Sequence, residues 1–315
     1  MPNQMIYKVA YRKQRSGRIS EIGGGSQSCS REQKHEGWSE LANVRNYDIK
    51  SSQIWGLYRQ FKEANECGCD LNINSLDKYL KGNKNILADE VGVSVDCWKG
   101  MLYGLFFGGF PKFTKEGKVP NWKKSNQYLK VEIIHKHICK ELGIKTDWSD
   151  CRKKRIWNAS SNDILRIRII LQRFYNQNNA LINELTKWHK YLGTRYLHHR
   201  ASYSGGGKRT VYITNKCDMK LELSEYLTYN QDRKERYLNR EGHRKLASHI
   251  LQGQEAVFIH YLTWYSSADP ECPYRVLSNQ HDGLVVYGSI TQEYINRACL
   301  DTDFPGIQLV EKPFK

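Results

Sequence analysis

Two aspartates, Asp48 and Asp282, are the residues of this chain with the clearest chemical potential. Asp48 ends a short extended stretch, whereas Asp282 follows Val276–Leu277 and precedes the apolar run Leu284–Tyr287, far along the chain. Two carboxylates that converge on divalent metal ions can catalyse nucleotidyl transfer, and strands are stiff elements on which to mount them. We therefore expect the fold to bring these two residues together.

The composition favours a partner that carries many phosphates. The 315 residues have a formal net charge of +16, and the basic residues are spread along the sequence rather than confined to a tail. Such a surface attracts phosphate backbones and releases counterions, and the 20 tyrosines and 8 tryptophans offer rings on which bases can stack. The alternative is that the charge serves only solubility. We expect a nucleic acid as the partner.

The cysteines and the apolar segments indicate a cytoplasmic protein without a membrane span. Nine cysteines are scattered without a paired C-x-x-C framework, and the N-terminus lacks the apolar run of a signal peptide. No stretch approaches the ~20 apolar residues that a membrane span needs. Cys67–Cys69 and His135–Cys139 lack a matching second half at zinc-site spacing, so we expect no structural metal.

The elements that must position the two aspartates follow from residue spacing. After Asp48, apolar residues recur at helical spacing from Ile54 to Phe61, which places Asp48 at a passage from strand to helix. A helix N-terminus at that point favours bound phosphate. Two strands flanking residues 281–283 predict a hairpin around Asp282. The alternative for this second segment is that Asp282 and Gly283 simply form the turn.

Further helices are expected through the middle of the chain. One closes on Gly92 and the next begins at Ser94, where Lys99, Tyr103 and Phe107 follow at four-residue steps on one face. The alternative for these three residues is an aromatic core stripe with a surface lysine. Long helices are predicted within 162–196 and 241–264, and a flexible joint at 204–208 precedes a strand over 209–214.

Taken in chain order, these segments resemble the polymerase core of family A, the DNA polymerase I-like enzymes, and more distantly the single-subunit RNA polymerases of phages and mitochondria. Residues 16–19 are similar to the T-G-R-L motif, and Gln27 and Arg31 stand where N-L-Q-N-I-P-x-R has glutamine and arginine. Residues 48–54 are similar to motif A, and residues 99–108 match motif B, K-x-x-x-[FY]-G-x-x-Y-G. Residues 244–253 are similar to R-x-x-x-N-x-x-x-Q-G, and residues 280–283 resemble motif C, V-H-D-E.

The resemblance implies an α+β fold, with a right-hand polymerase palm made of an antiparallel sheet with helices and a mostly helical fingers insertion. We expect residues 1–60 to form the first part of the palm with motif A, 61–203 the fingers, and 204–315 the second part of the palm with the motif C hairpin. Because the chain begins close to the T-G-R-L-like segment, we expect neither a thumb nor an exonuclease. An accessory protein could replace the thumb.

The resemblance also assigns roles to individual residues. Asp48 and Asp282 would be catalytic metal ligands for two Mg²⁺ ions, or Mn²⁺ in their place, about 4 Å apart. Lys99 would supply the fixed cation that stabilises the transition state. The nucleoside triphosphate would contact Lys99, Tyr103, Phe107 and Gln53. The DNA primer-template would contact Arg18, Gln27, Arg31, Arg244, Gln252 and His281.

The expected activity is that of a compact DNA-directed DNA polymerase that adds dNTPs to a primer 3′-hydroxyl. The wider spacing of motif A favours a single-subunit-type RNA polymerase or a primase-like enzyme as the alternative. Trp55 stands where DNA polymerases have a sugar-excluding glutamate, and Phe107 replaces a tyrosine of the RNA polymerases, so the sugar preference stays open. Val95 replaces a triphosphate-binding arginine, which favours a third hypothesis, a polymerase-derived nucleic-acid-binding subunit with impaired catalysis. The composition suggests a phage, plasmid or other mobile element in a bacterial host.

Overall fold

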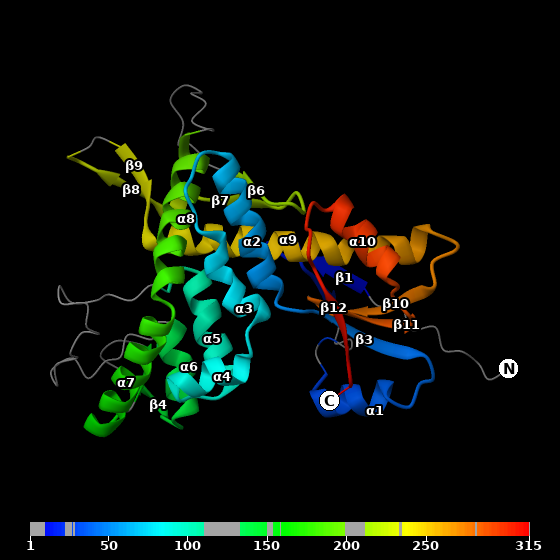
Figure 1. Ribbon diagram of the computed structural model, residues 1–315, viewed down its shortest axis with the longest axis horizontal. Helices are drawn as coiled ribbons and strands as arrows, with labels where there is room; N and C mark the ends of the chain where they lie inside the picture. Colours follow the sequence, from blue (N-terminus) through cyan, green and yellow to red (C-terminus); the bar gives the residue numbers. More distant parts are fainter. Residues whose placement is uncertain are drawn as a thin grey trace. The chain divides into compact units, whose positions relative to one another are not determined.

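The computed structural model describes residues 10–22, 27, 29–109, 133–149, 154–157, 159–198, 212–232, 235–280 and 282–314. It combines helices with antiparallel strands, so the α+β expectation is confirmed. The chain forms two compact units (Figure 1). The sheet unit comprises residues 1–60, 201–225 and 248–315, and the helical unit comprises residues 61–200 and 226–247.

The sheet unit is built on four antiparallel strands in the order β10–β11–β3–β12. They are β3 (Val44–Ile49), β10 (Tyr274–Asn279), β11 (Gly283–Gly288) and β12 (Leu309–Lys312). In this register Asp48 on β3 lies opposite Gly283 on one side and Val310 on the other. The centre of the sheet is therefore made by strands from distant parts of the chain.

Apolar side chains on one face of this sheet form the core of the unit. Tyr47 and Ile49 of β3 and Leu284 and Val286 of β11 belong to this buried cluster. They are covered by the second part of α9 (Arg240–Ala268) and by α10 (Gln292–Asp301), as Figure 1 shows. Because successive side chains of a strand alternate between faces, Asp48 lies on the face opposite this core.

Smaller elements complete the sheet unit. They are the hairpin of β1 (Ala10–Lys13) and β2 (Ile19–Ile22), the helix α1 (Arg31–Trp38), and the hairpin of β6 (Tyr212–Thr214) and β7 (Lys220–Glu222). The helix α2 (Ser52–Glu66) starts directly after the turn that follows β3, in which Ser51 has a φ of 57°. The predicted passage from strand to helix after Asp48 is therefore confirmed. The hairpin predicted around Asp282 is β10–β11.

The helical unit consists mainly of helices that pack on one another. Its helices are the 3-10 turn Ile73–Leu76, α3 (Asp77–Lys81), α4 (Lys84–Val91), α5 (Val95–Phe106), α6 (Ile133–Glu141), α7 (Ser161–Gln177) and α8 (Asn179–His198). Its strands are β4 (Thr146–Ser149), β5 (Lys154–Trp157), β8 (Leu227–Asn230) and β9 (Glu235–Leu238). Helix α5 contacts α4, α6 and α8, and its Trp98 and Met101 are fully buried.

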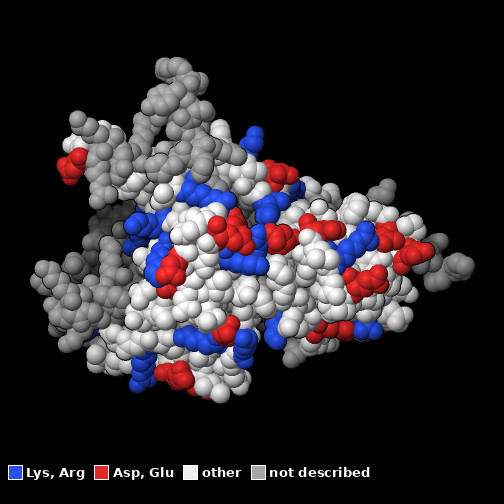
Figure 2. Space-filling view, turned by 45° about the horizontal axis from the view of Figure 1, so that its top comes forward, with Lys and Arg blue, Asp and Glu red and all other residues white. Residues whose placement is uncertain are grey.

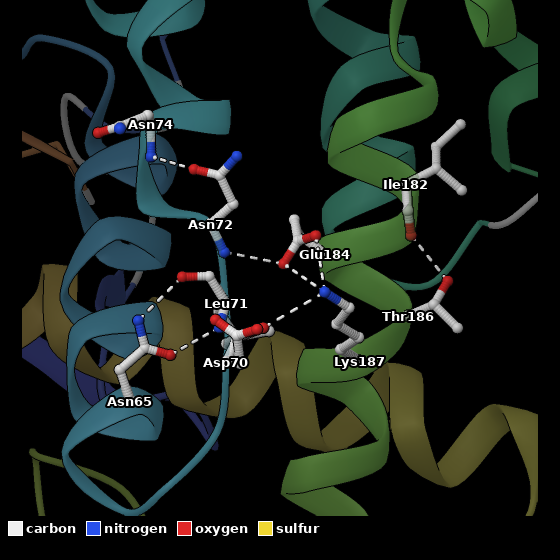
Figure 3. Close-up of polar contacts among 9 residues, drawn as sticks. All are labelled: Asn65, Asp70, Leu71, Asn72, Asn74, Ile182, Glu184, Thr186 and Lys187. Atoms are coloured by element: carbon white, nitrogen blue, oxygen red, sulfur yellow. Dashed lines mark hydrogen bonds and ion pairs between the residues drawn. The ribbon is translucent and has the colours of Figure 1, made fainter.

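Polar contacts fix the loop that follows α2 to α8 (Figure 3). The Asn65 side chain pairs with both backbone groups of Leu71, at 2.9 and 2.8 Å. The buried Glu184 of α8 accepts a hydrogen bond from the Asn72 N–H at 2.9 Å, and Lys187 pairs with Glu184 at 3.0 Å. These bonds satisfy backbone groups of Leu71 and Asn72 and fasten this part of the loop to α2 and α8.

None of the described helices combines the length and the apolar character that crossing a lipid bilayer requires. On the described part of the face drawn in Figure 2, basic and acidic side chains are interspersed rather than gathered into a single stripe. The positive charge of the chain is therefore distributed on this face, as the sequence indicated.

Candidate functional site

The fold places Asp48 and Asp282 next to each other in the sheet unit. The Ile49 N–H, one residue after Asp48, donates to the Asp282 carbonyl at 2.9 Å. Gly283, one residue after Asp282, lies directly opposite Asp48. A Cβ on Gly283 would lie 2.3 Å from the Tyr47 carbonyl oxygen, so the two strands approach this closely only because residue 283 is a glycine.

Asp282 lies in the loop of the hairpin rather than on a strand. Asn279 and Leu284 are the last paired residues, and the Gln280 N–H donates to the Gly283 carbonyl at 2.8 Å. The Asp282 N–H donates to the Gln280 carbonyl at 3.0 Å. Asp282 is half-buried at the end of the sheet. The preceding residue, His281, which was predicted to contact the primer-template, lies outside the described residues.

One oxygen of Asp48 already has a cationic partner. The ammonium group of Lys312, on β12, forms an ion pair with Asp48 Oδ2. The Asp48 side chain is 23% exposed and the Lys312 side chain 50% exposed, so the pair lies at the surface. Lys312 was not predicted as a site residue, because no sequence pattern near the C-terminal residues indicates that β12 pairs with β3.

A carboxylate that was not predicted from the sequence, that of Glu255, lies at the centre of a polar cluster. Glu255 on α9 is 1% exposed, accepts from Ser52 Oγ at 2.6 Å and from Gln53 Nε2 at 2.8 Å, and forms an ion pair with Arg18. Arg18 and Gln53 were assigned from the sequence to different ligands, the primer-template and the nucleotide. The structure brings both to one carboxylate. The sequence feature that could have identified Glu255 is its position as an acidic residue among the buried residues of α9.

Burial and two charged neighbours act on Glu255. Burial raises the pKa of Glu255, while the nearby positive charge of Arg18 acts to lower it. The negative charge of Asp282 raises the pKa of Glu255 further. Arg18, Ser52, Gln53 and Glu255 form one polar cluster in the sheet unit, the unit that also contains Asp282.

Gln27 supports the same end of the sheet through its own side chain. Its carbonyl accepts from the Glu21 N–H at 2.9 Å, and its amide donates to the Ile19 carbonyl at 3.1 Å and to the Asn279 carbonyl. Lys34 of α1 donates to Gln280 at 2.8 Å. These bonds fasten the β1–β2 hairpin and α1 to the β10–β11 hairpin. Arg31 is the first residue of α1, and the position of its side chain lies outside the described part of the structure.

Of the predicted motif B residues, Lys99 and Tyr103 lie on α5 in the helical unit, and Phe107 directly follows its last residue. Lys99, Tyr103 and Phe107 are all half-buried, whereas Trp98, Met101 and Leu105 face the core. Lys99 is 39% exposed at its side chain and lies 3.9 Å from Asp96. The Tyr103 ring contacts the Phe106 ring at a centroid distance of 5.9 Å. The alternative of an aromatic core stripe with a surface lysine stays open, because Tyr103 and Phe107 are half-buried while a neighbouring face of the helix is fully buried.

Arg244 lies beside the end of α5 within the helical unit. A Cβ on Gly108 would lie 3.1 Å from Arg244 Cγ and 3.1 Å from the His189 ring. Further along α9, Gln252 is half-buried in the sheet unit. The sheet unit thus holds Arg18, Gln27, Asp48, Gln53, Gln252 and Asp282, and the helical unit holds Lys99, Tyr103, Phe107 and Arg244.

The donor groups in the sheet unit fit one kind of metal site. Among the described residues, no group of three or more His, Cys, Asp or Glu side chains is arranged to hold a metal ion. Mg²⁺, however, is usually bound by one or two carboxylates together with substrate phosphates and water, not by a cage of protein ligands. Asp48 and Asp282 are two carboxylates, which is the number of protein ligands that such a site would use.

Comparisons with known proteins gave one kind of match. No family model matches the chain, and no curated protein matches it. Among solved structures, the chain is similar to the POL domain of Pol1 from M. smegmatis, determined in complex with DNA primer-template and dNTP, with a TM-score of 0.49 and 12% sequence identity. The match covers 97% of this chain, which spans 47% of the length of that one. At that identity and TM-score the likeness assigns no residue a role.

Proposed function

We propose that this chain is a template-directed nucleotidyltransferase, and specifically a DNA polymerase that adds dNTPs to a primer 3′-hydroxyl. The observation that carries the proposal is the adjacency of Asp48 and Asp282 through the bond between Ile49 and Asp282, 2.9 Å long. A fold that served only to bind nucleic acid would need basic side chains, but it would not need two acids at one end of a sheet.

The two aspartates would hold the metal, and the other residues would orient the reactants. Mg²⁺ or Mn²⁺ bound there would lower the pKa of the attacking hydroxyl and neutralise charge on the phosphates. Arg18 and Gln53, which meet at Glu255, would contact the primer end and the incoming nucleotide near these acids. Lys99 would stabilise the negative charge of the transferred phosphates, and Tyr103 and Phe107 would contact the sugar and base.

Gln27, Arg31, Arg244, Gln252 and His281 complete the proposed primer-template contacts. In this proposal the sheet unit acts as the palm and the helical unit as the fingers. This division is supported by the antiparallel sheet, with Asp48 on β3 and Asp282 in the β10–β11 loop, and by the half-buried Lys99 and Tyr103 of α5. Residues 226–247, which pack with the helical unit, would then extend the fingers.

A second candidate function is that of a nucleic-acid-binding subunit without catalysis. The ion pair between Lys312 and Asp48 favours it, because an ammonium group that stays on Asp48 would exclude a divalent ion. The exposure of half of the Lys312 side chain favours the polymerase instead, since a long solvated side chain can leave the carboxylate at little cost.

The test is primer extension with each of the eight ribo- and deoxyribonucleotides supplied separately on one primed DNA template with Mg²⁺. We expect the chain to extend the primer with the templated nucleotide, and the preferred sugar separates a DNA polymerase from an RNA polymerase. Binding of the same DNA is measured in parallel by fluorescence anisotropy. Tight, Mg²⁺-independent binding without any incorporation would establish the binding subunit and refute the polymerase.

A further inference from the structure

Glu255 has no chemical role in the proposed reaction, and yet three groups of the site converge on it. Its carboxylate is almost completely buried and is bonded by Ser52 and Gln53, from the first turn of α2, and by Arg18, from the β1–β2 hairpin. An ionised carboxylate accepts hydrogen bonds and donates none. Every group that faces Glu255 must therefore present a donor.

This requirement fixes the orientation of the Gln53 amide. Gln53 is 7% exposed, and its Nε2 donates to Glu255 Oε2 at 2.8 Å, so its carbonyl oxygen must face away from Glu255. That Oε1 atom is buried and has no hydrogen-bond partner among the described residues. A buried acceptor without a partner costs free energy unless a ligand or a water molecule supplies a donor. The unpartnered Oε1 atom can therefore accept a hydrogen bond from a ligand donor.

The kind of donor follows from the reaction. A template-directed enzyme must accept all four nucleotides, and the hydrogen-bond donors on the four bases differ in type and position. A sugar hydroxyl is a donor that every nucleotide carries in the same place. An acceptor held in one orientation therefore fits a sugar hydroxyl better than a base.

We propose that Glu255 is a positioning residue that holds the Gln53 amide with its carbonyl directed at a sugar hydroxyl of the incoming nucleotide. This inference rests on the proposed function. Arg18 completes the arrangement, because its guanidinium forms an ion pair with Glu255 and presents donors to the same carboxylate. Gln53 is thereby a residue that determines which sugar the enzyme prefers.

The Glu255→Gln variant tests the orientation with little change of shape. A glutamine at 255 can donate to Gln53 as well as accept, so the Gln53 amide is free to turn over. We expect the KM for the preferred nucleotide to rise about tenfold, the effect of one hydrogen bond, while kcat changes much less. The same rise is expected for Gln53→Ala, and the double variant should be no worse than Gln53→Ala alone.

The sugar dependence separates this role from a merely structural one. Incorporation is compared for ribo-, deoxy- and dideoxynucleotides in the wild type, in Glu255→Gln and in Gln53→Ala. We expect both variants to lose one of two preferences: that for ribonucleotides over deoxynucleotides, or that for deoxynucleotides over dideoxynucleotides. Glu271→Gln, which removes an exposed carboxylate of the same unit, should change neither preference.

Three results would overturn the inference. Unchanged sugar preferences in Gln53→Ala would show that its carbonyl contacts no sugar, and this variant decides the matter even if Glu255→Gln does not fold. Additive effects in the double variant would show that Glu255 does not act through Gln53. A wild-type protein that incorporates no nucleotide at all would refute the proposed function itself, and the inference with it.

Discussion

At the scale of single residues, the ammonium group of Lys312 would compete with Mg²⁺ for the carboxylate of Asp48. The ammonium group occupies Asp48 Oδ2, and half of the Lys312 side chain is solvent-exposed. An exposed ion pair contributes at most about 1 kcal/mol. In Lys312→Met we therefore expect the Mg²⁺ concentration for half-maximal extension to fall by about two- to fivefold. Lys216→Met, at an exposed lysine of the same unit, should leave it unchanged. An increased Mg²⁺ requirement in Lys312→Met would instead make Lys312 a substrate contact.

Two lysines of the helical unit should differ in what they contribute. Lys99 is half-buried on the α5 stripe, whereas the Lys81 side chain is 76% exposed and pairs with Asp77. A fixed cation beside the developing phosphate charge stabilises the transition state by several kcal/mol. We expect Lys99→Ala to lower kcat by on the order of 100-fold, and Lys81→Ala to reduce only the salt dependence of DNA binding. Equal effects on kcat would remove Lys99 from the catalytic set.

At the scale of elements, the junction between α4 and α5 determines where α5 begins. Gly92 ends α4 with a φ of 82°, and Ser94 caps α5 by accepting from the Cys97 N–H. Loss of such a cap costs about 1 kcal/mol. We expect Ser94→Ala to lower the free energy of unfolding of the helical unit by about that amount, measured by urea denaturation followed by circular dichroism. Ser94→Thr keeps the capping oxygen and should stay near the wild-type value. An unchanged Ser94→Ala would mean that the neighbouring helices alone fix the start of α5.

Elements with local signals could be predicted from the sequence, and those that depend on distant pairing could not. The end of α4 at Gly92, the start of α5 at Ser94 and the β10–β11 hairpin follow from residues within a few positions. The pairing of β12 with β3, which brings Lys312 to Asp48, has no local signal. Spacing placed Lys99, Tyr103 and Phe107 on one face, but the packing of α4, α6 and α8 decides which face of α5 is buried.

In the candidate site, too, some residues could be predicted from local sequence and others only from contacts between distant segments. Asp48 and Asp282 were selected by residue type and motif order, and the sheet register supplies the adjacency that the sequence could only assume. Glu255 was missed because the role of a buried acid on a helix can be recognised only when its donors are known, and these come from two other segments of the sequence, around Arg18 and at the start of α2. Gln27 was expected to contact nucleic acid, and its side chain is bonded to the backbone of β2 and β10.

At the scale of the whole molecule, buried histidines make the fold sensitive to acid. Among the described residues, burial lowers the pKa of His137, His189, His243, His249 and His260. For His189 it lowers the pKa to about 4, from 6.5. Between these values the unfolded chain binds more protons than the folded one, so the free energy of unfolding decreases as the pH falls from 6.5 towards 4.

The expected contribution of His189 to this loss is up to about 3 kcal/mol. Its Nε2 lies 3.2 Å from the Phe106 carbonyl, a contact that glutamine can reproduce. We expect His189→Gln to show a shallower decrease in the free energy of unfolding between pH 6.5 and 4, measured by urea denaturation at a series of pH values. His35→Gln, at an exposed histidine, serves as the control and should keep the wild-type slope. If His189→Gln keeps that slope too, His189 does not cause the acid sensitivity.

The central claim is that Asp48 and Asp282 bind divalent cations together, and Mn²⁺ binding followed by electron paramagnetic resonance tests it most directly. The titration is made with primer-template and an unreactive triphosphate present, for the wild type, Asp48→Asn, Asp282→Asn and the surface control Asp77→Asn. We expect wild type and control to bind Mn²⁺ equally, and each of the other two variants to bind it at least about tenfold more weakly while keeping its DNA affinity. Wild-type Mn²⁺ affinity in either Asp48→Asn or Asp282→Asn would contradict the account.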